Sequence, residues 1–271
     1  MDMDSVAARG LVLLGCGKMG SALLQGWLDR GLPPDAVHVI DPAPSDWLRG
    51  SGVHVNAELP ASPAIAVIAV KPQMMGDALP ALQSMGGGDT LFVSIAAGTP
   101  LTVYEAVFGT ESPIIRAMPN TPAAVGRGIT AIIGNRSARA DHLALAETLL
   151  SAVGQVVRLD AEDQMDAVTG VSGSGPAYVF HMIECLAAAG AAQGLPEDLA
   201  MRLARATVAG AGALSEAADE TPAQLRRNVT SPGGTTRAGL AVLMDDAAGL
   251  PPLIRRTVAA AADRSRELKN G

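Results

Sequence analysis

A glycine-rich turn between an apolar strand and an amphipathic helix constrains the fold of this chain more than any other feature. Residues 11–14 read Leu-Val-Leu-Leu, typical of a buried strand, and lead directly into Gly15-Cys16-Gly17-Lys18-Met19-Gly20. Apolar residues at helical spacing follow, and a second short strand at 37–40 leads to Asp41, 21 residues beyond Gly20. This G-x-G-x-x-G pattern, in the order strand, turn, helix, strand and acid, is typical of a dinucleotide-binding unit. The sequence therefore predicts nucleotide binding at this turn.

The first 160 residues alternate between short β-branched runs and longer helix-like segments. Such alternation is typical of a parallel sheet whose strands are joined by crossover helices. We predict an α/β fold with a Rossmann-like dinucleotide-binding domain over residues 1–160. Further strands are expected at 64–70, 91–95, 113–116, 129–133 and 155–158, and helices at 18–30, 74–84, 100–107 and 138–151. Functional groups in such sheets follow the carboxyl ends of the strands, which makes 71–72, 96–98 and 118–122 candidate binding segments.

From about residue 160 the β-branched runs disappear, and alanine- and leucine-rich stretches replace them. We predict that residues 161–271 form an all-α domain. Its helices are expected at 163–171, 175–193, 197–218, 222–228, 236–248 and 251–268. These helices carry more apolar surface than one copy of the domain can hide, and exposed patches of that size usually mark interfaces. We therefore expect a dimer or a larger assembly.

A second motif, Ser231-Pro232-Gly233-Gly234-Thr235-Thr236, interrupts the helical region. Pro232 is favoured in the first turn of a helix, and the two glycines leave the neighbouring backbone N–H groups bare. A helix N-terminus with exposed amides and two threonine hydroxyls is suited to binding a small carboxylate. An ordinary helix cap would use the same residue types, so this hexapeptide alone leaves both interpretations open.

Composition disfavours several other classes of protein. The 20 basic and 27 acidic residues give a net charge of −7 without a basic tail or patch, which argues against a nucleic-acid partner. The two cysteines, Cys16 and Cys185, lack metal-ligand spacing and provide no disulfide framework, as is usual in a reducing cytoplasm. The N-terminus lacks the pattern of a signal peptide, and the apolar runs are too short to span a membrane. We expect a cytoplasmic protein with no metal site and no membrane partner.

Six segments, in order over almost the whole chain, together resemble the pyrroline-5-carboxylate reductase family. They are Gly15–Gly20, Ala69-Val70-Lys71-Pro72-Gln73, Ser94-Ile95-Ala96-Ala97-Gly98, Arg116-Ala117-Met118-Pro119-Asn120-Thr121-Pro122, Asp166–Tyr178 and Ser231–Thr236. The last two are much more specific than a dinucleotide fingerprint. The resemblance implies reduction of the cyclic imine 1-pyrroline-5-carboxylate to L-proline, with NADPH or NADH as hydride donor. It also implies that the helical domains dimerise and that dimers often assemble into decamers.

The resemblance also implies which residues form the site. The loop at 231–236 would hold the substrate carboxylate, and Thr236 would be the catalytic residue, with its hydroxyl facing the ring nitrogen. The expected substrate-binding residues are Ser174, Gly175, Ser231, Gly233, Gly234, Thr235 and Thr236. The expected cofactor-binding residues are Gly15, Cys16, Gly17, Lys18, Met19, Gly20, Asp41, Asn56, Val70, Lys71, Pro72, Ala96, Ala97, Gly98 and Asn120. A protonated imine accepts a hydride readily, so the reaction requires no nucleophile, metal or histidine base.

One segment departs from the family pattern. Asp41-Pro42-Ala43-Pro44-Ser45 stands where many members have serine or arginine, and no basic residue occurs between Arg30 and Arg49. A carboxylate at Asp41 would bind the ribose hydroxyls of NADH and repel the 2′-phosphate of NADPH. Ser45 could still contact a phosphate, so the cofactor preference stays open.

Two other functions are compatible with the same domain order. A β-hydroxyacid or 6-phosphogluconate-type dehydrogenase also joins a dinucleotide domain to a helical one. Such enzymes generally use a lysine acid/base in the helical domain, whereas the only lysine beyond residue 160 here is Lys269. A non-catalytic dinucleotide-binding sensor would keep the fold, but the complete loop at 231–236 argues against it.

Overall fold

The structure is a computed structural model that describes residues 3–268, so Lys269 lies outside the described residues. The chain forms two compact units: unit 1 comprises Met1–Gly173 and Ala261–Gly271, and unit 2 comprises Ser174–Ala260. Residues 161–173 and the end of the last helix therefore belong to the same compact unit as the sheet. Our predicted domain boundary at residue 160 assigns them to the helical domain instead. Within the described residues, no helix is long and apolar enough to cross a membrane.

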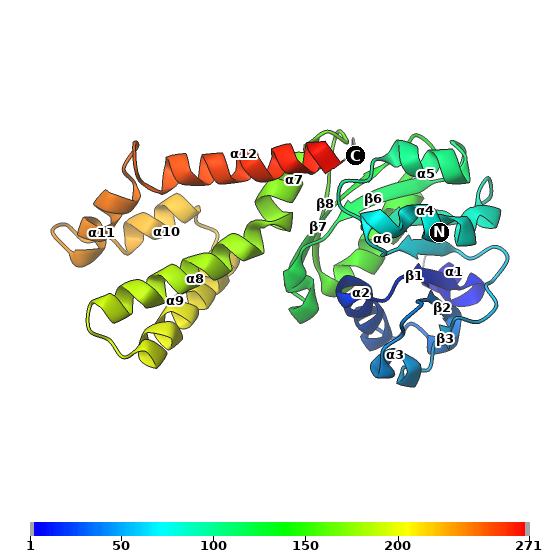
Figure 1. The fold of residues 1–271 in the computed structure, drawn as a ribbon, viewed down its shortest axis with the longest axis horizontal. Helices are drawn as coiled ribbons and strands as arrows, with labels where there is room; N and C mark the ends of the chain where they lie inside the picture. The colour runs from blue at the N-terminus through cyan, green and yellow to red at the C-terminus, as the bar shows by residue number, and fades with distance from the viewer. Residues whose placement is uncertain (1–2, 269–271) are drawn as a thin grey trace. The chain divides into compact units, whose positions relative to one another are not determined.

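Unit 1 is built on an eight-stranded sheet (Figure 1). Its strands are β1 (Leu11–Leu14), β2 (Val37–Ile40), β3 (His54–Val55), β4 (Ile65–Ile68), β5 (Leu91–Ser94), β6 (Ile114–Met118), β7 (Gly128–Gly134) and β8 (Gly154–Arg158). The strand order is β3-β2-β1-β4-β5-β6-β7-β8, and all neighbours run parallel except β6 and β7. The first six strands follow the 3-2-1-4-5-6 order of a dinucleotide-binding sheet. The predicted Rossmann-like fold is confirmed.

Helices cover the sheet of unit 1, and unit 2 consists of helices and the turns that join them. The α-helices are α1 (Met3–Arg9), α2 (Lys18–Asp29), α3 (Asp46–Gly50), α4 (Met75–Ala78), α5 (Leu101–Phe108), α6 (Ala140–Leu150), α7 (Gln164–Val168), α8 (Gly175–Ala192), α9 (Glu197–Ala217), α10 (Pro222–Asn228), α11 (Thr235–Leu243) and α12 (Leu250–Leu268). The short 3₁₀ helices are η1 (Pro34–Ala36), η2 (Pro72–Met74), η3 (Leu79–Met85), η4 (Thr121–Val125) and η5 (Ser151–Val153). A π-helical turn, η6 (Thr169–Gly173), continues α7.

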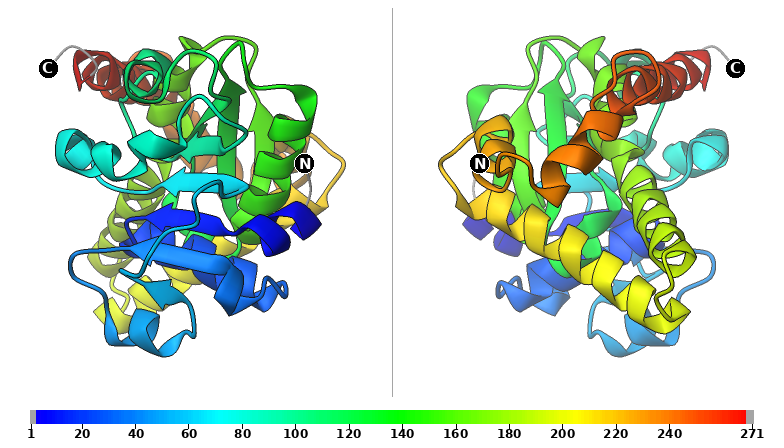
Figure 2. Two further views of the ribbon diagram at one scale, coloured as in Figure 1. Left: turned by 90° about the vertical axis from the view of Figure 1, so that its right-hand side faces the viewer. Right: turned by 90° about the vertical axis from the view of Figure 1, so that its left-hand side faces the viewer.

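Helices of unit 1 lie on opposite faces of the sheet (Figure 2), and a layer of apolar side chains fills the space between the sheet and the helices on each face. Alternate residues of β1 divide between them: Leu11 and Leu13 belong to the layer under α1, α2 and α6, and Val12 and Leu14 to the layer under η3 and α5. A strand buried on both faces must be apolar throughout, which is why β1 reads as a continuous hydrophobic run.

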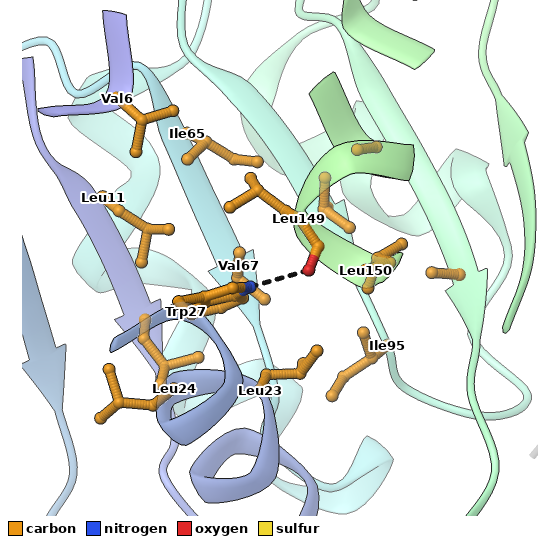
Figure 3. Packing of buried hydrophobic residues seen from close by; sticks show 14 of the residues in the cluster. Val6, Leu11, Leu23, Leu24, Trp27, Ile65, Val67, Ile95, Leu149 and Leu150 are labelled. Atoms are coloured by element: carbon orange, nitrogen blue, oxygen red, sulfur yellow. Dashed lines mark hydrogen bonds between the residues drawn. The ribbon is translucent and has the colours of Figure 1, made fainter. Parts of the chain in front are cut away.

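Trp27 is the largest fully buried side chain of the first layer, only 2% exposed. Figure 3 shows its indole between α2 and α6, where Nε1 donates to the Leu149 carbonyl at 2.9 Å. The indole therefore joins two segments 122 residues apart in sequence by both packing and a buried hydrogen bond.

The observed elements differ from the predicted ones in several places, since α1 and α3 were not predicted and α11 ends at Leu243 rather than at residue 248. The helix expected at 74–84 is divided into η2, α4 and η3, and Pro80 at the start of η3 accounts for a break there because it cannot donate to the preceding turn. The two-residue strand β3 carries too little periodicity to be predicted. Pro232 does not occupy the first turn of α11, because this helix begins at Thr235 with Gly234 as its N-cap.

Trp27→Phe should lower the free energy of unfolding of unit 1 by about 1–3 kcal/mol, because it removes a buried donor from the Leu149 carbonyl. Urea denaturation followed by circular dichroism measures this change. Trp47→Phe is the matched control: Trp47 is 40% exposed, and its replacement should stay within about 0.5 kcal/mol of the wild type. Equal stabilities of the two variants would contradict the role assigned to the indole.

Candidate active site

The three glycines of the fingerprint turn have different structural roles. Gly15 has φ +91°, a conformation that favours glycine, and its N–H donates to the Ile40 carbonyl at 2.8 Å. A Cβ on Gly20 would lie 2.5 Å from the Gly15 carbonyl oxygen, so α2 can approach the end of β1 only without a side chain there. A Cβ on Gly17 would meet nothing within 4 Å. Gly15 and Gly20 therefore serve packing, whereas Gly17 borders open space.

That open space adjoins the N-terminus of α2. Gly17 is the N-cap, and no side chain caps the helix, so its first N–H groups are available to a ligand. The exposed Lys18 adds a positive charge in the first turn. A cavity of about 540 Å³ lies here, lined by Cys16, Gly17, Lys18, Ser21, Ala22, Gln25, Ser45, Trp47 and Ala124. A helix N-terminus of this kind stabilises a phosphate anion, so the residues present fit the pyrophosphate of a dinucleotide.

Asp41, just after β2, is held by backbone groups on both sides. Its Oδ2 accepts from the Cys16 N–H at 2.7 Å, and its Oδ1 accepts from the Ala43 N–H at 2.8 Å. The Asn56 side chain forms two hydrogen bonds with the backbone of Asp41. The Asp41 N–H donates to Asn56 Oδ1 at 2.9 Å, and Asn56 Nδ2 donates to the Asp41 carbonyl at 2.8 Å. Asn56 adopts φ +52°, a conformation that asparagine tolerates better than most residues. The carboxylate is thus fixed beside the glycine-rich turn.

Cys16 is a neutral thiol. Burial, and secondarily the nearby Asp41 carboxylate, raise its pKa to about 11. Only a thiolate is a strong nucleophile, so this cysteine is inert at neutral pH and acts through its backbone N–H.

The other expected cofactor residues follow the carboxyl ends of β4, β5 and β6. Val70, Lys71 and Pro72 lead from β4 into η2, with Lys71 as the N-cap of that turn and exposed. Ala96, Ala97 and Gly98 form the turn between β5 and α5, where Gly98 has φ +74°. Because β4 and β5 are parallel neighbours of β1, these segments lie at the same edge of the sheet as the fingerprint turn.

Asn120, expected beside the cofactor, uses its amide within the protein. Its Oδ1 accepts from the Ile129 N–H at 2.9 Å, and its Nδ2 donates to the Ser172 carbonyl at 3.2 Å. The side chain is 9% exposed. Asn120 thereby ties the segment after β6 to the start of β7 and to η6, and it can influence a ligand through the position of that segment.

In unit 2, the segment at 231–236 forms a tight turn before α11. The Gly234 N–H donates to the Ser231 carbonyl at 3.2 Å, and Gly233 has φ +71°. A Cβ on Gly234 would overlap the Ser231 hydroxyl, so this close approach requires glycine. No side chain caps α11, and Ser231, Thr235 and Thr236 are exposed. The free N–H groups and hydroxyls thus gather at one helix N-terminus, as a carboxylate site requires.

Ser174 and Gly175 occupy the start of α8, where Ser174 is the N-cap without a side-chain cap and Gly175 has open space around its Cα. Within unit 2 of a single copy, this start lies apart from the turn before α11 (Figure 1). One copy of the chain therefore does not bring the two groups of predicted substrate residues together within unit 2.

The sequence interpretation missed two kinds of site residue. Gln25, Trp47 and Ala124 line the cavity at α2 but belong to no recognisable motif. Tyr104 pairs with Ser94, and Glu162 with Arg116, in a partly buried polar cluster below the turn between β5 and α5. An arginine in the otherwise apolar strand Ile-Ile-Arg-Ala-Met was the available signal, since a buried guanidinium requires an acidic partner. Within residues 3–268, no group of three or more His, Cys, Asp or Glu side chains could hold a metal ion.

The strand order, the uncapped α2 N-terminus and the fixed acid after β2 define a Rossmann-type dinucleotide-dependent oxidoreductase. Two family models agree with this class: "NADP oxidoreductase coenzyme F420-dependent" matches residues 10–98, and "Pyrroline-5-carboxylate reductase dimerisation" matches residues 162–268. The pyrroline-5-carboxylate reductase of Synechocystis sp. is 44% identical over 265 residues, covering 95% of this chain and 97% of that protein. The chain belongs to the pyrroline-5-carboxylate reductase family.

Solved structures agree over the whole length. A pyrroline-5-carboxylate reductase from Coxiella burnetii matches with a TM-score of 0.90 at 32% identity, covering 96% of this chain and 98% of that one. Plasmodium falciparum pyrroline carboxylate reductase, solved with NADP bound, matches with a TM-score of 0.81 at 28% identity, covering 96% and 98%. The predicted family is confirmed. The match of residues 162–268 to the dimerisation family model also supports the expected self-association of the helical region.

Replacing Gly17 and Gly20 by alanine should affect different properties, namely cofactor affinity for Gly17 and stability for Gly20. Gly17→Ala should leave the free energy of unfolding unchanged and raise the Kd for NADH about tenfold, because the methyl group enters the space beside the helix N-terminus. Gly20→Ala should lower the free energy of unfolding by roughly 1–3 kcal/mol, because α2 must move away from Gly15. Cofactor titration and urea denaturation on both variants check this. The assignment fails if both lose stability equally.

Proposed function

We propose that this chain reduces 1-pyrroline-5-carboxylate to L-proline with a nicotinamide dinucleotide bound to unit 1. The observation that carries the proposal is the uncapped N-terminus of α11, where Ser231, Gly233, Thr235 and Thr236 present N–H and hydroxyl donors together. Gly234, whose N–H donates within the turn, allows the close approach of the backbone. These donors hold the substrate carboxylate, and Ser174 and Gly175 complete the pocket from the start of α8. Because these donors are neutral, they place no positive charge of their own beside the protonated imine.

The protein orients the cofactor and the imine relative to each other, and the bound nicotinamide supplies the hydride. Gly15–Gly20 bind the pyrophosphate at the α2 N-terminus, and Asp41 receives the adenosine ribose. The segments at 70–72 and 96–98, with the loop that Asn120 positions, border the nicotinamide half. Thr236 hydrogen-bonds the ring nitrogen of the imine through its hydroxyl. Holding the two reactants in this geometry replaces a bimolecular encounter by an intramolecular step.

We propose that NADH serves at least as well as NADPH. The Asp41 carboxylate is fixed beside the glycine-rich turn by the Cys16 and Ala43 N–H groups, so it cannot easily turn away from a 2′-phosphate. The Ser45 hydroxyl already accepts from the Leu48 N–H at 3.2 Å as the N-cap of α3. Lys18 is the one basic residue among those lining the cavity, and it lies at the pyrophosphate end.

We further propose a cytoplasmic homodimer, in which residues 161–271 act as the substrate-binding and dimerisation domain and dimers assemble into a decamer. Apolar side chains of α8 and α11 such as Phe180 and Val242 are 60% and 75% exposed in the single chain, which favours burial against a second copy. A second copy would also supply the substrate residues that one copy leaves apart.

The decisive assay is reduction of pyrroline-5-carboxylate by the purified protein, followed by the loss of NADH absorbance. We expect turnover without added metal and unchanged rates in the presence of a chelator. Undetectable turnover with both nicotinamide cofactors in folded protein would exclude the enzyme and favour a dinucleotide-binding sensor. Oxidation of a β-hydroxyacid instead would favour the dehydrogenase alternative.

Asp41→Ser should shift the ratio of kcat/KM for NADPH to kcat/KM for NADH towards NADPH by about tenfold, since one unfavourable charge pair near 4 Å is worth about 1 kcal/mol or more. If the substitution also loosens the glycine-rich turn, kcat/KM should fall by the same factor for both cofactors, and this factor cancels in the ratio. Asp46→Asn removes an exposed acid from α3 nearby and should leave the ratio within about twofold. A strong wild-type preference for NADPH would show that Asp41 does not face the ribose.

Thr236→Ala should lower kcat/KM for the imine by about 10- to 150-fold, the cost of a hydrogen bond to a charged group of roughly 1.5–3 kcal/mol. NADH affinity should not change, and Thr236→Ser should retain most activity. The alternative role, capping α11, is disfavoured because Gly234 is the N-cap and no side chain caps the helix.

Thr221→Ala is the matched control for capping alone. Thr221 is the N-cap of α10, and its side chain accepts from the Gln224 N–H. This variant should lose about 1 kcal/mol of stability and keep wild-type kinetics. If Thr236→Ala behaves in the same way as Thr221→Ala, the role of Thr236 is structural.

A further inference from the structure

A charged side chain lies in the core of unit 1, below the turn between β5 and α5. Arg116 stands in the middle of β6 and is only 2% exposed. Its Nη1 donates to Glu162 Oε1 at 2.9 Å, and the Glu162 side chain is 30% exposed. Burying a guanidinium without a counter-charge is costly, so the position of Arg116 depends on Glu162.

Glu162 makes a second contact, which reaches the end of the turn. The same Oε1 accepts from the Leu101 N–H at 2.9 Å. Leu101 is the first residue of α5, and the N-cap of this helix, Pro100, offers no side-chain cap. Helices are usually capped by a neighbouring serine, threonine, aspartate or asparagine. Here a glutamate 61 residues away caps α5, and it thereby fixes where the turn ends.

Two hydroxyls fix the start of the same turn. Ser94 is the last residue of β5 and is fully buried, and its Oγ lies 2.5 Å from the Tyr104 hydroxyl. Ser94 Oγ also accepts from the Ala96 N–H at 3.3 Å. Burial raises the pKa of Tyr104, and hydrogen bonds with Ser94 and Thr99 offset this only in part. The phenol therefore stays neutral and keeps its hydrogen bond at physiological pH.

These four side chains, Ser94, Tyr104, Arg116 and Glu162, are called the polar clamp below. They reach the turn at 96–98 through the backbone N–H groups of Ala96 and Leu101. From outside, the end of α12 packs on the turn, because a Cβ on Gly98 would lie 3.3 Å from Leu268 Cβ. The turn is thus held at both ends and on one side by residues that belong to neither predicted binding set.

We propose that the polar clamp positions the turn at 96–98 against the nicotinamide half of the cofactor, an inference that rests on the proposed function. In a sheet of order 3-2-1-4-5-6, each half of the dinucleotide lies over one half of the sheet. The fingerprint turn and Asp41 assign the adenosine half to β1–β3, which leaves the nicotinamide half over β4–β6. The clamp residues are positioning residues, because they act on the cofactor through the backbone of the turn.

The test compares a ligand that has the nicotinamide with one that lacks it. Dissociation constants of NADH and of ADP-ribose are measured by calorimetry for the wild type, Glu162→Gln and Tyr104→Phe. Glu162→Gln keeps an acceptor for the Leu101 N–H but removes the charge opposite Arg116, and Tyr104→Phe removes only the hydroxyl. We expect a rise in the NADH Kd on the order of tenfold in both variants, because small displacements of positioning groups have large effects. The ADP-ribose Kd should stay within about twofold of the wild type.

Two control variants separate positioning from general loss of stability. Thr90→Val removes a buried hydroxyl that donates to the Pro63 carbonyl at 2.9 Å, at the opposite end of β5 from Ser94. Glu147→Gln removes the acidic partner of Arg158, in a glutamate–arginine pair that joins α6 to β8. Both should leave NADH and ADP-ribose affinities unchanged even if the melting temperature falls.

Equal weakening of NADH and ADP-ribose, or unchanged NADH binding in Tyr104→Phe, would overturn the inference. Tyr104→Phe decides the matter if Glu162→Gln does not fold. The comparison uses binding and not turnover, so it is separate from the proposed function. A wild type that binds NADH but reduces no pyrroline-5-carboxylate contradicts the function and still allows the clamp to be judged.

Discussion

The close approach of α2 to the end of β1 is the constraint on which the rest of unit 1 depends. It exists because Gly20 has no side chain to meet the Gly15 carbonyl, and Gly15 can adopt the φ that turns the chain sharply. Once α2 lies there, Trp27 reaches the Leu149 carbonyl and joins the first and last parts of the sheet unit. The same approach leaves the N-terminus of α2 open beside Gly17, so a single packing constraint determines both the core and the position of this open helix N-terminus.

Much of this arrangement could be predicted from the sequence because it depends on local chemistry. Periodicity identifies β1 and α2, and Gly15–Gly20 identify the turn between them, since each signal lies within a few residues. The helices of unit 2 were also predictable, because long alanine-rich stretches have few alternatives. The placing of Pro232 in the first turn of α11 was wrong for a local reason, because proline is also favoured in the turn that precedes a helix.

What the sequence could not provide is the pairing of distant polar groups. Asp41 was predicted to face a ribose, but nothing local indicates that Cys16 and Asn56 hold it in place. Glu162 lies in a segment without a recognisable motif, and its link to Arg116 and Leu101 arises only when the sheet is assembled. The separation of Ser174 from the turn before α11 within unit 2 is a similar case, because no local pattern indicates it.

The bond from the Cys16 N–H to Asp41 has a consequence for how such an enzyme can change over evolutionary time. The carboxylate that we propose discriminates between the two cofactors also accepts a hydrogen bond from the turn that we propose binds both of them. A substitution that removes the charge but supplies no acceptor would weaken binding of either dinucleotide before any new preference is gained. Lineages that switch cofactor are therefore expected to pass through replacements that still accept a hydrogen bond at this position, such as serine or asparagine. Basic residues would be added only afterwards, so the geometry of one backbone amide restricts the order in which specificity can evolve.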